Sequence, residues 1–136
     1  MRAVLDTGIF ISALISDKSY PYGAFDLWLN GAFELVTSEW QIEEVRAVSR
    51  YDHVAPLLKS YQAGGLVNRL RKKATVLRSL PQVAFSPDPD DNPIIATALA
   101  GKASYLVSGD KGDLLALGSV KDVRIVTARA FVEWMK

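Results

Sequence analysis

Short apolar runs alternate with longer amphipathic stretches along this chain. The runs are rich in β-branched residues and have the length of buried strands, whereas the stretches between them have room for helices of several turns. The predicted strands cover residues 3–5, 33–37, 83–85, 105–108 and 123–126. Strands that alternate with helices predict an α/β fold with a mainly parallel sheet.

Capping signals mark the start of three predicted helices. Ser38 with Gln41 three residues later forms a capping box, and Asn92 followed by Pro93 has the pattern of an N-cap and a first helical residue. Thr127 opens the last predicted helix in the same manner.

A strongly basic segment lies between residues 46 and 78. Gly64 and Gly65 are predicted to divide it into two helices, near residues 54–61 and 66–75. It has eight basic side chains against one acid, so its net charge is +7 and that of the rest of the chain is −6. Such a split suits a protein that binds a polyanion on one surface and cations on another. A solvated basic helix without a ligand is the alternative.

The composition narrows the class of protein. With 136 residues, 49% of them hydrophobic, the chain is long enough for a single globular domain over residues 1–136. The absence of cysteine excludes disulfides, zinc-thiolate sites and cysteine nucleophiles. Asp6 interrupts the first apolar run, which is too short for a signal peptide or a membrane span. We therefore expect a soluble, cytoplasmic protein that does not enter a membrane.

Acidic residues follow several of the predicted strands. Ligands of open parallel α/β sheets bind beyond the carboxyl ends of the strands. Asp6 and Asp110 come just after the first and fourth predicted strands, and Asp91 precedes the helix that follows the third. We expect these three carboxylates at one edge of the sheet. An Asp in the turn-rich segment 86–92 is also a common helix cap or turn former, which is the alternative reading.

A fourth acid is selected by the helix that begins after Ser38. At about 100° per residue, Glu44 falls between Trp40 and Val48 on the apolar arc, whereas Glu43 falls with Arg46 on a charged face. Only Glu44 is therefore expected to point inward.

Converging carboxylates repel one another unless a cation neutralises them. Sites made of oxygen ligands alone favour Mg²⁺ or Mn²⁺. The candidate metal-binding and catalytic residues are Asp6, Glu44, Asp91 and Asp110.

Five segments, in their order and spacing, together resemble one known family. They are residues 4–14, 33–38, 88–92, 106–111 and 124–127. These are similar to the opening strand and helix, the second strand, two later acidic motifs and the closing strand of the PIN-domain nucleases. Within that family, the chain resembles the VapC-like toxin components of prokaryotic toxin-antitoxin systems.

The resemblance implies a PIN-like fold, with a mainly parallel central β-sheet flanked by helices as an α/β/α sandwich. It also implies one or two Mg²⁺ or Mn²⁺ ions held by the four acids, cleavage of single-stranded RNA, a homodimer and a cognate antitoxin protein. Ser108 corresponds to the hydroxyl residue usually found near the fourth acid, and Asp113 to an auxiliary acid. Gly8 departs from the family pattern, which usually has asparagine there.

The chemistry that fits these residues is phosphodiester hydrolysis by a metal-activated water. Four basic residues are the first candidates for binding the RNA phosphates. They are Arg69, Arg71, Lys72 and Lys73.

Other classes of protein fit the acids less well. A receiver-like phosphoacceptor domain needs adjacent acids at the end of the first strand, where Leu5 precedes Asp6. A haloacid-dehalogenase-type phosphatase needs a second Asp at the position of Gly8. A non-catalytic PIN-like module that binds RNA or another protein is the stronger alternative, and metal-dependent cleavage separates it from an enzyme.

Overall fold

A central sheet organises the helices of this computed structural model. The structure describes residues 1–109 and 112–136. In the described residues the sheet has six strands in the order β3-β2-β1-β4-β6-β5. Neighbouring strands are parallel except for β5, which is antiparallel to β6. The strands are β1 (Arg2–Leu5), β2 (Glu34–Ser38), β3 (Thr75–Leu77), β4 (Tyr105–Val107), β5 (Ser119–Val120) and β6 (Val123–Val126). The mainly parallel α/β sheet predicted from the sequence is confirmed.

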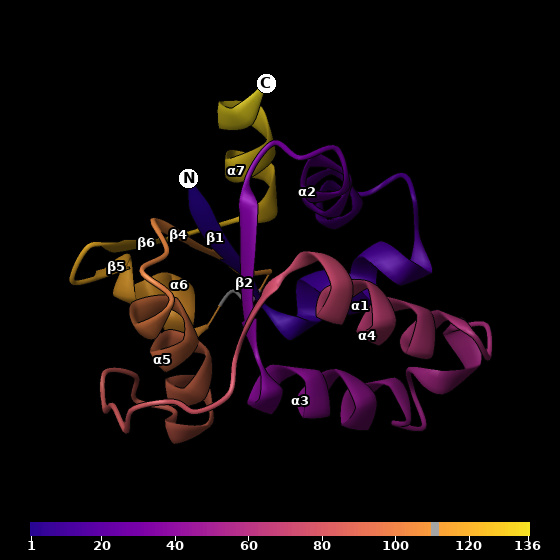
Figure 1. Ribbon diagram of the computed structural model, residues 1–136, viewed down its shortest axis with the longest axis horizontal. Coiled ribbons are helices and arrows are strands. Elements are labelled where there is room, and N and C mark those ends of the chain that lie inside the picture. The colour runs from indigo at the N-terminus through magenta and orange to yellow at the C-terminus, as the bar shows by residue number, and fades with distance from the viewer. Residues whose placement is uncertain (110–111) are drawn as a thin grey trace.

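Helices cover both faces of this sheet (Figure 1). The α-helices are α1 (Thr7–Ile15), α2 (Tyr20–Leu29), α3 (Glu39–Ser49), α4 (Gln62–Lys73), α5 (Asn92–Ala100), α6 (Asp113–Leu117) and α7 (Ala128–Met135). Two short 3₁₀ turns are η1 (Ala55–Leu57) and η2 (Pro89–Asp91).

Alternating strand residues divide the core into two layers. Leu5 packs with residues of α1, α2, α3, α4 and α7, whereas Val4 packs with residues of α5 and α6. Leu35 and Val36 of β2 divide between the two clusters in the same way. Because successive strand side chains point to opposite faces, this alternation gives the predicted α/β/α sandwich.

The predicted strand at residues 83–85 is wrong. Those residues lie in an irregular segment, where the backbone N–H of Phe85 donates to Asn92 Oδ1 at 3.1 Å instead of joining a strand ladder. The strand next to β2 is β3, and Val76 lies opposite Thr37. The third strand therefore precedes the irregular segment.

The predicted break at Gly64 and Gly65 is also wrong. Helix α4 continues through both glycines, and the helix expected near residues 54–61 is reduced to the 3₁₀ turn η1. Leu66, Val67 and Leu70 on one side of α4 are buried in the core. Their packing outweighs the helix propensity lost at glycine, about 1 kcal/mol per residue relative to alanine.

The capping predictions hold in part. Ser38 Oγ accepts from the N–H of Gln41 at 3.2 Å, and Thr127 Oγ1 caps α7 by accepting from the N–H of Ala130 at 3.1 Å. Asn92 is the first residue of α5 rather than its cap, because the N-cap position belongs to Asp91.

Gln41 does not complete the predicted capping box. Its fully buried side chain donates to the carbonyl of Leu5 at 2.6 Å and accepts from Thr37 Oγ1 at 2.6 Å. This contact ties the first turn of α3 to the end of β1, so the two elements that carry Glu44 and Asp6 are held in a fixed relation.

Among the described residues, no helix has the length and apolar character needed to cross a membrane.

Candidate active site

Asp6 lies where β1 ends and α1 begins. Its Oδ1 accepts from the N–H of Thr7 at 2.8 Å, so the carboxylate caps α1. Its Oδ2 accepts from Ser108 Oγ at 3.2 Å, and Ser108 is the buried residue that follows β4. Two neighbouring strands thus fix the half-buried carboxylate of Asp6 at the carboxyl edge of the sheet.

Glu44 reaches the same edge from α3. The Thr7 hydroxyl donates to Glu44 Oε1, so Thr7 links Glu44 to Asp6 through its side chain and its backbone N–H. Glu44 is half-buried, whereas Glu43 is exposed and pairs with Arg46 at 3.2 Å. The predicted facing of the two glutamates is confirmed.

The environment of Glu44 opposes its ionisation. Burial raises the pKa of the Glu44 carboxyl above its usual range, and the charges of Asp6, Asp91 and Asp90 raise it further. The hydrogen bond from Thr7 lowers the pKa but does not cancel these effects. Asp6 acts on Glu44 from the end of β1, and Asp90 and Asp91 act on it from η2. Acids from three segments of the chain are therefore close enough to affect one another's ionisation.

This raised pKa predicts a pH-dependent change of stability in Glu44→Gln. Because the folded protein disfavours the charged form of Glu44, the stability associated with this group is complete when the carboxyl is protonated and is lost as the pH rises through its folded pKa. In chelator, Glu44→Gln should therefore have a higher free energy of unfolding than the wild type at pH 7, and the difference should vanish near pH 4. Urea unfolding at both pH values measures it. A difference that is equal at the two pH values would contradict the electrostatic cause.

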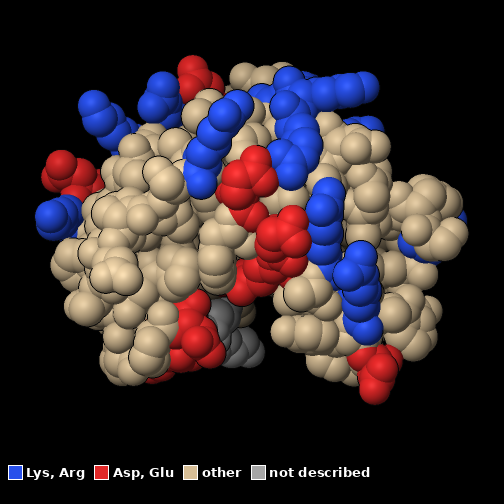
Figure 2. Space-filling model, turned by 60° about the horizontal axis from the view of Figure 1, so that its bottom comes forward, with Lys and Arg blue, Asp and Glu red and all other residues tan. Residues whose placement is uncertain are grey.

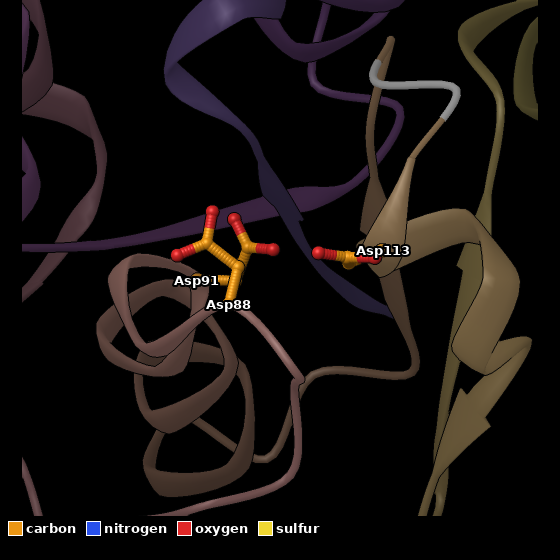
Figure 3. Close-up of side chains that lie close together, drawn as sticks. All are labelled: Asp88, Asp91 and Asp113. Carbon is orange, nitrogen blue, oxygen red and sulfur yellow. The ribbon is translucent and has the colours of Figure 1, made fainter.

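Three further acids form a cluster beside this pair (Figure 3). One carboxylate oxygen from each of Asp88, Asp91 and Asp113 lies within 4.8 Å of the other two. Asp91 is the last residue of η2, Asp88 is its N-cap, and Asp113 points toward them from the first turn of α6. Ser86 Oγ donates to Asp91 Oδ2 at 3.2 Å.

These oxygens are close enough together for one small divalent cation to reach all three. Two oxygens bound to one Mg²⁺ at about 2.1 Å lie about 3.0 Å apart at neighbouring positions and about 4.2 Å apart at opposite positions of an octahedron. Both separations fall within the limit that Asp88, Asp91 and Asp113 satisfy. The donor set consists of carboxylate oxygens, which a hard cation prefers.

The structure brings most of the predicted residues to one edge of the sheet. Asp6 and Glu44 are joined through Thr7, and Asp91 acts electrostatically on Glu44. Asp113, the auxiliary acid that the resemblance implies, lies in the first turn of α6, and its carboxylate is near that of Asp91. Asp110 lies outside the described residues.

Two residues of this region were missed as site residues. Asp88, in the turn-rich segment 86–92, is a turn former that accepts from the N–H of Asp90 at 3.0 Å, but it also belongs to the acidic cluster. Side chains three residues apart eclipse in a 3₁₀ turn, so the spacing of Asp88 and Asp91 was a usable signal. The role of Thr7 carried no such signal, because it depends on the distant Glu44.

Comparison with known protein families identifies the family of this chain. The sequence model of the PIN domain family matches residues 2–112, which is most of the chain. The chain belongs to the PIN domain family. It is also similar to an uncharacterized protein of Methanocaldococcus jannaschii, with 32% identity over 124 residues that cover 86% of this chain and 75% of that protein. PIN domains are generally nucleases that use divalent metals, and the acidic cluster of this PIN domain is consistent with that chemistry.

Basic side chains lie next to acidic side chains on one face of this PIN domain. Figure 2 shows Lys and Arg side chains above and to the right of the acidic side chains, which reach a notch in the surface.

Two of the predicted RNA-binding residues already form hydrogen bonds with other residues of this chain. Arg71 donates to both carboxylate oxygens of Glu39, at 2.8 and 3.0 Å, and Lys73 donates to the carbonyl of Leu29 at 3.2 Å. A phosphate would have to compete with these contacts at Arg71 and Lys73. Lys73 nevertheless lines a hollow of the surface together with Arg69 and Lys72.

Proposed function

We propose that this PIN domain is a divalent-metal-dependent endoribonuclease that cleaves single-stranded RNA. The observation that carries the proposal is the convergence of carboxylates from β1, α3, η2 and α6 at one edge of the sheet. The proposed metal-binding and catalytic residues are Asp6, Glu44, Asp91 and Asp110, with Asp88, Ser108 and Asp113 as auxiliary residues.

Each described acid has a distinct part in this proposal. A bound Mg²⁺ or Mn²⁺ would lower the pKa of water and polarise the phosphoryl group. Asp6 is oriented by Thr7 and Ser108, so its carboxylate is fixed before a ligand arrives. Glu44, with its raised pKa, is suited to hold a water molecule and accept its proton.

The substrate class is tested with matched oligonucleotides. The purified protein should cut a fluorescent single-stranded RNA in Mn²⁺, and should cut the same strand much more slowly in a duplex or as DNA. Equal cleavage of all three substrates would contradict the proposed RNA specificity, and absence of cleavage would favour the non-catalytic alternative.

Metal binding should also stabilise the fold. A cation at 100 times its Kd adds about 2.7 kcal/mol to the free energy of unfolding, which corresponds to a rise in Tm on the order of 10 °C for a chain of this size. Asp6→Asn combined with Asp91→Asn should remove most of the rise that Mg²⁺ or Mn²⁺ produces in thermal unfolding. An unchanged rise in the double variant would place the metal elsewhere.

A non-catalytic RNA-binding module is the second candidate function, and Gly8 is the observation that favours it. Asparagine is the family's usual residue at this position, and glycine has no side chain to orient Asp6 or to donate to a phosphate. Gly8 is exposed in the first turn of α1, and a Cβ added there meets no atom within 4 Å.

Gly8→Asn should therefore fold normally and increase the rate of RNA cleavage. One additional hydrogen bond to the substrate corresponds to about 2- to 10-fold. The comparison of initial rates in Mn²⁺ checks this prediction, with thermal unfolding as a control for the fold. An equal or lower rate would show that the amide is not what this site lacks.

We further propose that the single domain 1–136 is the cytoplasmic toxin of a toxin-antitoxin pair, acts as a homodimer and is inhibited by an antitoxin protein. This proposal rests on the resemblance of the acidic motifs to those of VapC-like toxins. Induced expression should arrest bacterial growth, Asp6→Asn should abolish the arrest, and the product of a gene next to this one should relieve it. Light scattering tests the dimer. Growth arrest that persists in Asp6→Asn would contradict a nuclease toxin.

A further inference from the structure

A cavity of about 620 Å³ lies beside the acids, between the start of α3, the segment that follows β3, and the η2–α5 turn. The residues that line it include Trp40, Arg78, Gln82 and Asn92. Cavities of about 300 to 1,000 Å³ are typical of small-molecule sites, and their lining is mostly apolar with a few polar groups. This cavity therefore has the size and the lining of a small-molecule site.

The cavity shares two elements with the proposed active site. Trp40 precedes Glu44 by four residues on α3, so the two side chains lie on the same side of the helix, one turn apart. Pro89 and Asn92 of the cavity wall flank Asp91 along the chain. The cavity therefore adjoins the elements that carry Glu44 and Asp91.

The wall of the cavity is fixed by the protein itself. Asn92 Oδ1 accepts from the N–H groups of Phe85 and Ser86, at 3.1 and 3.0 Å, and so fastens the irregular segment to the start of α5. Trp40 and Val83 are half-buried and pack against the core layer beneath α5. The cavity is therefore formed before any ligand enters.

Arg78 brings a positive charge to the rim. Its side chain is exposed. The hydrogen bond from Arg71 is the main cause of the lowered pKa of the Glu39 carboxyl at the start of α3, and the charge of Arg78 lowers that pKa further. A cationic and an aromatic residue that line one cavity suit a nucleotide, which presents a flat base and a phosphate together.

We propose that this cavity binds one unpaired base of the RNA, stacked on Trp40, with Arg78 beside the adjoining phosphate. The inference rests on the proposed ribonuclease function and identifies where the base next to the cleaved bond is held. Stacking on an aromatic ring tolerates any base and requires it to be unpaired, so a base site of this kind would produce the proposed preference for single strands over duplexes.

The test uses binding without cleavage. A fluorescent single-stranded RNA is titrated with the full chain in chelator, and Kd is measured by anisotropy. Trp40→Leu should weaken binding by about 5- to 100-fold, the loss typical of one stacked base, and Trp40→Phe should lose much less. Trp134→Leu is the matched control, because Trp134 is 61% exposed on α7 and is not part of the cavity wall. Thermal unfolding confirms that each variant is folded.

A series of RNAs with one abasic site each identifies the stacked base. In the wild type, one position of the abasic site should weaken binding, and in Trp40→Phe and Trp40→Leu that penalty should shrink. The inference would be overturned if Trp40→Leu and Trp134→Leu changed Kd equally, or if Kd did not depend on the position of the abasic site. An apolar peptide would then be the better occupant. Because RNA cleavage in Mn²⁺ is measured separately, failure of the base site and failure of the ribonuclease function are distinguishable.

Discussion

Replacement of Glu44 by Gln should reduce metal-dependent RNA cleavage by about 10²- to 10⁴-fold, the range that a positioned general base contributes. The substitution retains an oxygen that can accept from the Thr7 hydroxyl, so the contact between α1 and α3 is preserved. What is lost is the charge and the basicity of the carboxylate. Initial rates on one single-stranded RNA in Mn²⁺ measure the effect.

Glu43→Gln is the matched control for this prediction. Glu43 is the adjacent residue of the same helix, but it is exposed and its partner is Arg46. An exposed pair contributes about 0 to 1 kcal/mol to stability, so this variant should keep nearly the wild-type rate and fold. If Glu43→Gln proved the more damaging change, the assignment of the site would be wrong.

Asp91→Asn should have a comparably large effect on cleavage. Asp91 belongs to the carboxylate cluster with Asp88 and Asp113, and it also acts on Glu44, so it connects the two groups of acids. Loss of this proposed metal ligand should lower the rate by two orders of magnitude or more and raise the Mn²⁺ concentration needed for half-maximal rate. Asp88→Asn should show a smaller loss in the same direction.

Asp90→Asn provides the control within the same turn. Asp90 is exposed and lies outside the cluster, although its charge contributes to the raised pKa of Glu44. The variant should retain most of the rate and an unchanged Mn²⁺ requirement. Equal losses in Asp90→Asn and Asp91→Asn would mean that the cleavage rate depends on the total negative charge of this turn rather than on a metal bound at Asp91.

Local patterns were sufficient to predict much of this fold. The alternation of apolar runs and helical stretches predicted the sheet, and the helical period separated Glu44 from Glu43. The position of Asp6 at the end of β1 also followed from local sequence. These features depend on residues that are neighbours along the chain.

The errors arose where distant partners decide the local structure. Residues 75–77 and 83–85 are both short and rich in strand-forming residues, and only pairing with β2 selects the first of them. The second is held by the side chain of Asn92 instead. In the same way, the link from Thr7 to Glu44 and the approach of Asp113 to Asp88 become visible only when the chain is folded.

The most direct test of the proposed site is the rate of single-stranded RNA cleavage by wild type, Asp6→Asn and Asp91→Asn, each in Mn²⁺ and in chelator. A metal site at this edge of the sheet predicts cleavage by the wild type in Mn²⁺ but not in chelator, and losses of at least about 100-fold in both folded variants. Cleavage by the wild type that persists in chelator, or variants that cut RNA at the wild-type rate, would contradict a metal-dependent nuclease site at this edge of the sheet.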